Sequence, residues 1–470
     1  MVWGILNTHT GTPGHRDTGT PGHRDTGTPG HRDTGTPGHR DTYGLTDRWL
    51  VRDGELVPAS IVLTHDEQLR RLATASPAAL SSAFVGGDPC FDRMVASEHQ
   101  RNRYRHALGV DDDRTIVAVT STWGRRSLFG AHPDLITELT TELEIDSYVI
   151  AVILHPNTWY AHGPAQIRLW LGEALRGGLR LIPPAEGWQQ AILASDIVIG
   201  DNGSVTGYGA ATGRPTLLAT FPSEDVVPGS VIDALGQSAA RLDLRAAFQP
   251  QLAAAHPADP EVRTLTTSAP SEASDRHRAE FYRLMNLPEL ASPALLPIYS
   301  SDDLRPIRSP LTAWWASTST DAEGNITVRR WPADPVGRPN HPPQDVHRHL
   351  VVAAHEPRRD LSGNAAICII EGSDSHTTAA SVLRQRPVCS LVVTRESATT
   401  CTLTHRAGWS ARLTARPDQG LDLDPAILAS VIHDQSSFRR GGPILPLAFV
   451  VYLGSRRVTV SITEVRSGVQ

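Results

Sequence analysis

The stretch that decides the fold is residues 196–219, DIVIGDNGSVTGYGAATGRPTLLA. It opens with a short apolar run, DIVIG, which is typical of a buried strand. A turn of polar and small residues, DNGS, follows, and SVTGYGAATG then predicts a short helix that ends before a second apolar run, PTLLATF. A strand that leads through small residues into a helix presents the free backbone N–H groups of the helix start at the edge of a sheet. The stretch therefore predicts a βαβ unit with an anion-binding turn.

The same alternation extends upstream of this unit. Strands are predicted in TIVAVTSTWG (115–124), YVIAVILHPN (148–157) and LRLIPP (179–184), and helices over 133–143, 165–178 and 188–196. Alternating strands and helices predict a parallel sheet. Because the strands are almost uninterrupted apolar runs, we expect helices on both faces of that sheet.

The N-terminal region carries a perfect repeat. Residues 9–40 are four octapeptides, the first HTGTPGHR and the others DTGTPGHR. Since every unit contains Pro and Gly, neither a long helix nor a central strand can form, and we expect a disordered arm without a core. The alternative is a metal-binding comb of His15, His23, His31 and His39, although a flexible comb has no fixed ligand geometry.

Composition excludes several classes of protein. The 470-residue chain has a net charge of −6, and all 44 of its basic residues are arginines. A phosphate loop of the Walker type needs a lysine, so the chain is not a P-loop NTPase. The lack of a long basic run argues against nucleic-acid binding, and no apolar run is long enough to span a membrane. Four scattered cysteines and the lack of a signal peptide predict a cytoplasmic location.

Polar residues follow three of the predicted strands, where ligands of parallel sheets bind. The candidate donor-phosphate residues are Ser121, Thr122, Arg125, Asp201, Asn202, Gly203, Ser204, Val205 and Thr206, and the candidate catalytic residue is His155. Backbone N–H groups at the start of the helix favour a diphosphate, and an arginine can form a bidentate pair with it. The alternative from spacing alone is ordinary capping of a βα turn without a ligand.

Two features resemble a known superfamily. The first feature resembles the C-terminal nucleotide-binding half of GT-B enzymes, and it consists of ILHPN, a strand with IPP and then residues 201–215. The closest resemblance is to CDP-glycerol glycerophosphotransferases and UDP-N-acetylglucosamine 2-epimerases. VGGDPCFDR (85–93) resembles the segment that joins the two Rossmann halves in these families. The resemblance implies that a CDP- or UDP-linked donor places its phosphates near Ser204 and faces His155.

The chain also departs from these families. Gly207 and Tyr208 occupy the positions of the epimerases' acidic pair, and most of the N-terminal half is missing. THTGTP (8–13) resembles the glycerophosphotransferase motif Trp-His-Gly-Thr-Pro, but Thr10 stands at its histidine position. A complete N-terminal domain needs more than about 100 residues, so catalysis by this chain does not follow from the resemblance.

Five segments are predicted. They are a disordered octapeptide-repeat arm (1–42), a remnant of the N-terminal Rossmann domain (43–92), a Rossmann-like nucleotide-binding domain (93–290), a linker (291–345) and a β-rich α+β domain (346–470). The fold class is therefore α/β, a Rossmann-like parallel sheet of GT-B type with an added β-rich domain.

The predicted function is that of a GT-B-like glycosyl- or glycerophosphotransferase. The alternatives are a non-catalytic nucleotide-sugar-binding or interaction protein and a degenerate gene product. No cofactor and no metal are expected: His347 and His349 share one strand face with His355 nearby, but no third ligand follows at a suitable spacing.

Overall fold

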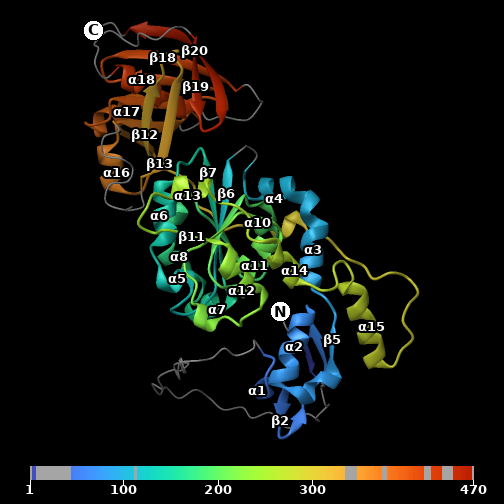
Figure 1. Cartoon of the computed structure of the whole chain (residues 1–470). Helices are drawn as coiled ribbons and strands as arrows, with labels where there is room; N and C mark the ends of the chain where they lie inside the picture. Colours follow the sequence, from blue (N-terminus) through green and yellow to red (C-terminus); the bar gives the residue numbers. More distant parts are fainter. Residues whose placement is uncertain are drawn as a thin grey trace, which may run out of the picture.

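The structure, a computed structural model, describes residues 3–6, 44–110, 114–333, 347–372, 378–417, 425–436 and 448–467. Figure 1 shows three bodies along the molecule: a small N-terminal sheet, a central sheet and a C-terminal barrel. The octapeptide repeat and the THTGTP segment lie outside the described residues. The prediction of disorder for them therefore stays a prediction.

The N-terminal body is a three-stranded sheet in the order β1-β4-β5. α2 (Asp66–Ala75) connects the parallel strands β4 (Pro58–Leu63) and β5 (Ala83–Val85). Before them come α1 (Asp47–Leu50), β2 (Val51–Arg52) and β3 (Glu55–Leu56). β1 (Trp3–Leu6) pairs antiparallel with β4. The segment that was predicted to be a disordered arm therefore begins with a strand. This strand forms because β4 offers a free sheet edge for it to pair with.

The central sheet has six strands, all parallel, in the order β11-β10-β9-β6-β7-β8. They are β6 (Thr115–Ser121), β7 (Tyr148–Leu154), β8 (Arg180–Ile182), β9 (Ile197–Gly200), β10 (Thr216–Leu218) and β11 (Ala240–Arg241). Read from β8, the order in the chain is 3-2-1-4-5-6, that of a doubly wound Rossmann fold. The strand order reverses between β6 and β9, which makes their carboxyl ends the expected ligand-binding edge.

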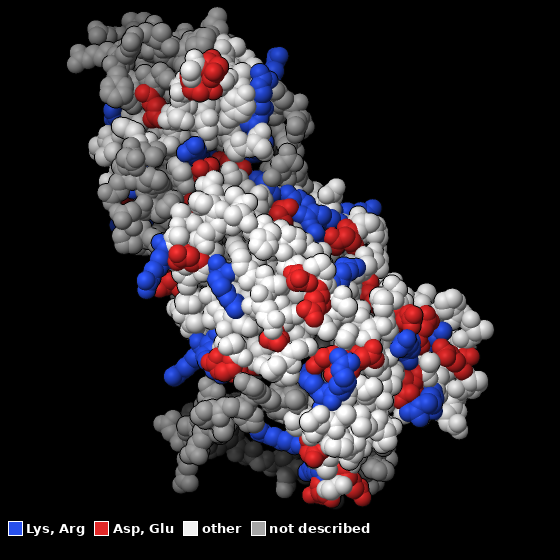
Figure 2. Space-filling view, viewed as in Figure 1, with Lys and Arg blue, Asp and Glu red and all other residues white. Residues whose placement is uncertain are grey.

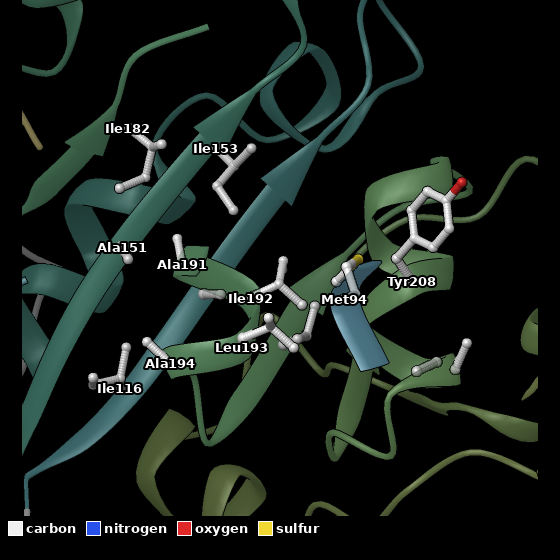
Figure 3. Close-up of a cluster of buried hydrophobic side chains, with 14 of the residues drawn as sticks. Met94, Ile116, Ala151, Ile153, Ile182, Ala191, Ile192, Leu193, Ala194 and Tyr208 are labelled. Carbon is white, nitrogen blue, oxygen red and sulfur yellow. The ribbon is translucent and has the colours of Figure 1, made fainter. Parts of the chain in front are cut away.

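Helices cover both faces of this sheet, as the apolar strands predict. One face packs on α3 (Pro89–Ser97), α4 (Arg101–Ala107), α10 (Trp188–Ala194), α11 (Ser204–Ala211), α12 (Val231–Ser238) and α14 (Pro260–Thr266). The other packs on α5 (Leu128–Ala131), α6 (Leu135–Glu142), α7 (Pro156–His162), α8 (Pro164–Trp170), α9 (Gly172–Arg176) and α13 (Phe248–Ala253). Figure 3 shows Ile116, Ala151, Ile153 and Ile182 facing the side chains of α10.

The chain returns to the N-terminal body after the central sheet. The N–H of Ser268 donates to the carbonyl of Thr64, and the hydroxyl of Ser268 accepts from the N–H of Asp66. α15 (Ala273–Met285) follows, and the guanidinium of Arg276 donates to the carbonyl of Val85. The N-terminal body is therefore fastened to the central body by a segment about 200 residues further along the chain.

The C-terminal body is a closed barrel in the order β12-β13-β19-β20-β18-β17-β16-β15-β14. Its strands are β12 (Ala313–Thr320), β13 (Ile326–Pro332), β14 (His349–Ala353), β15 (Ile367–Glu371), β16 (Leu391–Arg395), β17 (Thr400–His405), β18 (Trp409–Pro417), β19 (Ala448–Leu453) and β20 (Arg456–Ser467). α16 (Arg359–Asn364) and α17 (Ala379–Gln385) pack outside it, and α18 (Ala429–Ser436) contributes to its core. The β-rich prediction is correct, whereas the closure was not predicted.

The predicted linker is wrong at its C-terminal end. β12 and β13 lie within residues 291–345 and form adjacent strands of the barrel. Trp314 and Val328 bury their side chains in its core, while Pro, Asp and Ser dominate the residues around these strands. The local composition therefore concealed a pair of strands that long-range pairing stabilises.

The molecular surface carries charges of both signs. On the face shown in Figure 2, arginine and acidic side chains are interspersed and form no continuous basic surface. Among the described helices, none combines the length and the apolarity that crossing a membrane requires.

Candidate functional site

A cavity of about 780 Å³ lies at the carboxyl ends of β6 and β9. The N-terminal body contributes its α2 side, and the central body contributes the starts of α7 and α11. Its lining includes Arg71, Asp88, Thr122, Arg126, His155, Asn202, Gly203, Ser204, Tyr208 and Asp225. The cavity thus sits at the point where the strand order reverses, between two bodies of the chain.

The floor of the cavity is the start of α11. Gly203 is the N-cap residue, and Ser204 is the exposed first residue of the helix. A Cβ atom on Gly203 would lie 2.6 Å from Cγ2 of Thr122, so only glycine lets the two loops approach this closely. The free N–H groups of the first helical turn lie at this end of the helix and favour an anionic group.

Asp201 organises the two loops beneath the cavity and has no oxygen left over for a ligand. Oδ2 of Asp201 accepts two hydrogen bonds from Thr122, one from its backbone N–H at 2.8 Å and one from its side-chain hydroxyl at 2.7 Å. The N–H of Leu128 donates to the same oxygen at 2.9 Å, and the N–H of Gly203 donates to Oδ1 at 3.1 Å. Burial raises the pKa of Asp201, and these hydrogen bonds oppose that rise. Asp201 is therefore a positioning residue.

Three other predicted donor contacts also face the protein interior. The hydroxyl of Thr206 pairs with that of Thr120 at 2.7 Å, and Thr206 is fully buried. The Ser121 hydroxyl accepts from the N–H of Phe129 and donates to the carbonyl of Thr122. Val205 packs against the hydrophobic core. Of the predicted donor-phosphate residues, Thr122, Asn202, Gly203 and Ser204 line the cavity, as does the predicted catalytic residue His155.

Arg126 faces the cavity, whereas the predicted Arg125 lines a different hollow. Arg125 borders a space of about 490 Å³ beside Phe129 and Trp170. Arg126 pairs with Glu224 at 2.8 Å and with Asp225, which joins the loop after β6 to the opposite rim of the cavity. Two consecutive arginines on a loop cannot be told apart from sequence spacing.

Arg71 of α2 is a cation that the sequence did not reveal. Its side chain is only 15% exposed, and Nε lies 2.6 Å from Oε1 of Glu67, one helical turn earlier. Nη1 is buried and has no hydrogen-bond partner within the described part of the chain. Because Arg71 lines the cavity, its guanidinium places a positive charge beside the space that an anionic ligand would occupy. The one possible signal was the Glu67–Arg71 spacing on a helix.

His155 presents a hydrogen-bond donor to the cavity. The N–H of Asn157 donates to Nδ1 of His155 at 3.0 Å, at the N-cap of α7. The neutral ring therefore carries its proton on Nε2. Burial lowers the pKa of His155, and the charge of Asp201 opposes this. The neutral form can donate a hydrogen bond, but its Nδ1 is not free to accept a proton.

Asp88 and Tyr208 close the base of the cavity. The Tyr208 hydroxyl donates to Oδ2 of Asp88 at 2.7 Å, while Oδ1 caps α3 through the N–H groups of Cys90 and Phe91. Tyr208, which departs from the epimerase pattern, thus links α11 to the GGDP segment. Both oxygens of Asp88 are engaged by the protein.

The chain matches no protein-family model and no curated protein. Solved structures that match include the wall teichoic acid polymerase TagF, with TM-score 0.26 and 18% identity over 34% of this chain and 38% of that chain. The UDP-GlcNAc 2-epimerase from Neisseria meningitidis bound to UDP-GlcNAc matches with TM-score 0.27 and 13% identity, over 49% of this chain and 61% of that one. WaaG, a glycosyltransferase involved in lipopolysaccharide biosynthesis, matches with TM-score 0.25 and 16% identity, over 47% of this chain and 57% of that chain.

A UDP-GlcNAc 2-epimerase, one of the two kinds of protein that the sequence resembles, is among these matches. The chain covers less than two thirds of each of them. With TM-scores below 0.5, the matches do not decide what the chain does, and function has to be inferred from the cavity itself.

Proposed function

We propose that the cavity binds the diphosphate of a CDP- or UDP-linked donor and that the chain is a GT-B-like glycosyl- or glycerophosphotransferase. The observation that supports this most strongly is the convergence of three kinds of donor on one cavity: the helix start at Gly203 and Ser204, the guanidinium of Arg71 and the Nε2–H of His155. Each is a group that binds phosphate oxygens in proteins.

The same groups define how transfer would be assisted. The leaving group is UDP when a UDP-linked sugar is transferred and CMP when glycerol phosphate is transferred from CDP-glycerol, and in both cases negative charge develops on its phosphate oxygens. Fixed N–H groups at the start of α11 and the Arg71 guanidinium stabilise that charge without reorganising. His155 would donate its Nε2 proton in a hydrogen bond to the same oxygens, which makes it an electrostatic group and not a general base.

One observation favours the alternative of binding without transfer. The lining carboxylates Asp88 and Asp225 are both engaged, Asp88 by Tyr208 and the start of α3, and Asp225 by Arg126. An acceptor hydroxyl usually loses its proton to a positioned base. Within the described residues, the cavity offers no carboxylate without a partner, so the acceptor or the nucleophile would have to be activated otherwise.

The test is calorimetric titration of the purified full-length chain with UDP-N-acetylglucosamine and CDP-glycerol. We expect binding of at least one donor, and Arg71→Gln should weaken it about 10-fold or more because a charge-assisted hydrogen bond is lost. The matched control is Arg70→Gln, which removes an exposed arginine next to it in the same helix. Ser204→Arg should abolish binding by filling the floor of the cavity.

Binding that is unchanged in both Arg71→Gln and Ser204→Arg would rule out this cavity. Failure of the folded parent chain to bind any of these donors would overturn the proposed function. Release of UDP from UDP-N-acetylglucosamine, or of CMP from CDP-glycerol, in the presence of acceptor candidates separates the transferase from the non-catalytic binding protein.

A further inference from the structure

A cluster of two histidines and one aspartate lies inside the C-terminal barrel, away from the cavity described above. His349 is the first residue of β14, and it lies two residues before Val351, a core residue of the barrel. Side chains two residues apart in a strand share a face, so His349 points into the barrel. His433 and Asp434 belong to α18, whose Val431 and Ile432 are part of the same core.

The three side chains converge on one point. Nδ1 of His349 lies 3.1 Å from Oδ1 of Asp434, and Nδ1 of His433 lies 3.3 Å from the same oxygen. The two imidazole rings have centroids 4.5 Å apart. One ligand atom from each of the three residues can be chosen so that all lie within 4.8 Å of one another.

Protein groups alone leave this cluster incompletely satisfied. His349 is 3% exposed, and neither of its ring nitrogens has a hydrogen-bond partner among the residues that the structure describes. Its Nδ1 is close to Asp434, but the contact is not aligned as a hydrogen bond. Buried ring nitrogens normally have partners, and an unsatisfied one calls for an explanation such as a bound ion.

A hydrogen bond to its second oxygen orients the carboxylate of Asp434. The hydroxyl of Thr318 in β12 donates to Oδ2 of Asp434 at 2.6 Å, on the side away from the histidine contacts. Burial would raise the pKa of Asp434, but the contacts with His349, His433 and Thr318 outweigh it and hold the pKa well below its usual range. Asp434 is therefore an oriented anion, and a partner of this kind behind a ligand is typical of metal sites.

We propose that His349, His433 and Asp434 bind one divalent transition-metal ion in the C-terminal barrel, with Zn²⁺ as the best-fitting ion. Two imidazoles and a carboxylate are a donor set that Zn²⁺ accepts, with metal–ligand distances of about 2.0–2.2 Å. Such distances and a tetrahedral arrangement put neighbouring ligand atoms about 3.3 Å apart. The contacts of 3.1 and 3.3 Å to Asp434 match that spacing.

The site does not depend on the donor-binding cavity, and it answers a question left open by the sequence. His347 and His349 were expected to bind no metal, because the sequence shows no third ligand at a suitable spacing from them. The missing ligands come from α18, more than 80 residues further along the chain and consecutive in it.

The experiment uses full-length chain stripped with a chelator, in which the five histidines of residues 9–40 are replaced: His9→Gln, His15→Gln, His23→Gln, His31→Gln and His39→Gln. This background removes metal binding by the arm. The chain is titrated with Co²⁺, followed by visible absorption, and with Zn²⁺, followed by calorimetry and thermal melting. We expect one equivalent of Co²⁺ with the intense visible bands of a four- or five-coordinate site, and a rise in Tm with Zn²⁺.

The test variants are Asp434→Asn and His433→Gln, and the matched control is His355→Gln, an exposed histidine of the same barrel. Each test variant should weaken Zn²⁺ binding about 10-fold or more, because metal affinity depends on each ligand. The control should bind as the parent does. Two results would overturn the proposal: no Co²⁺ bound once the repeat histidines are gone, or equal Zn²⁺ affinity in parent and test variants. Thermal melting without metal shows which of the two test variants are folded. One folded test variant is enough to decide the proposal.

Discussion

Asp201 shows at the residue scale how a buried charged side chain can shape a cavity that it does not itself line. Its carboxylate receives the backbone N–H groups of Thr122, Leu128 and Gly203, which come from two loops on neighbouring strands. Asp201→Asn replaces one acceptor oxygen by an NH₂ group and leaves at least one buried N–H unpaired. We expect the free energy of unfolding to fall by about 1–3 kcal/mol, as measured by urea denaturation.

The control for this variant is Asp243→Asn, because Asp243 is an exposed aspartate of the same body. This substitution should change the free energy of unfolding by less than about 0.5 kcal/mol. Because Asp201 also shapes the start of α11, donor affinity should fall together with stability. A variant that loses donor affinity at unchanged stability would instead make Asp201 a direct ligand.

At the residue scale, the sequence predicted the position of a residue where the backbone decides it and failed where side-chain direction decides, while donor binding by these residues stays a prediction. Gly203 and Ser204 line the cavity because a strand–turn–helix pattern fixes their place. Thr206 lies only two residues further on, but the turn of the helix carries it into the core beside Thr120. Arg71 was missed because its proximity to the site depends on the packing of another body.

At the scale of elements, one hydroxyl connects α11 of the central sheet to the start of α3. Tyr208→Phe removes the donor to Oδ2 of Asp88 and leaves the ring in place, while Oδ1 continues to cap α3. A buried carboxylate oxygen then lacks a partner, so we expect a loss of about 1–3 kcal/mol in the free energy of unfolding. Tyr160→Phe, at an exposed position, is the control and should be neutral. Equal stability of Tyr208→Phe and the parent would show that the link contributes nothing.

The elements of the central sheet were predictable because their signals are local. β6, β7 and β9 are apolar runs followed by polar loops, and the structure places them as predicted. The helix expected over 165–178 is instead α8 and α9, separated at Leu171. The barrel was harder to predict, because β13 pairs with β19, more than 110 residues away. Such pairing leaves no periodic pattern beyond the strand itself.

At the scale of the whole molecule, one buried aspartate joins the central sheet to the barrel. Asp146 precedes β7, and its side chain is 3% exposed. Arg330 of β13 donates to both of its oxygens at 2.8 Å, and Arg456 of β20 donates to Oδ1 at 2.8 Å. Burial would raise the pKa of Asp146, but the two arginines outweigh it and hold the pKa below its usual range. The barrel is thereby attached to the sheet through a charge network excluded from water.

Breaking that network should destabilise the junction far more than breaking a surface pair. Asp146→Asn leaves two guanidinium groups without their anion, and removing one partner of a buried pair costs about 3–5 kcal/mol. We expect this loss in the free energy of unfolding, with separate calorimetric transitions for the sheet and the barrel. Glu144→Gln is the control: Glu144 lies 3.8 Å from the exposed Arg329, so its loss should cost less than about 1 kcal/mol.

The effect of Asp146→Asn should also depend on pH, with a definite sign. A carboxylate whose pKa is lowered by folding stabilises the protein above its ordinary pKa of about 3.9, and this contribution is lost as the pH falls toward the lowered value. The stability difference between the parent and Asp146→Asn should therefore be constant from pH 7 to about pH 5 and shrink below about pH 4. The asparagine has no charge to lose, so only the parent changes through this group. A difference that stays the same at pH 3, measured by urea denaturation, would mean that the network at Asp146 does not hold the barrel to the sheet through charge.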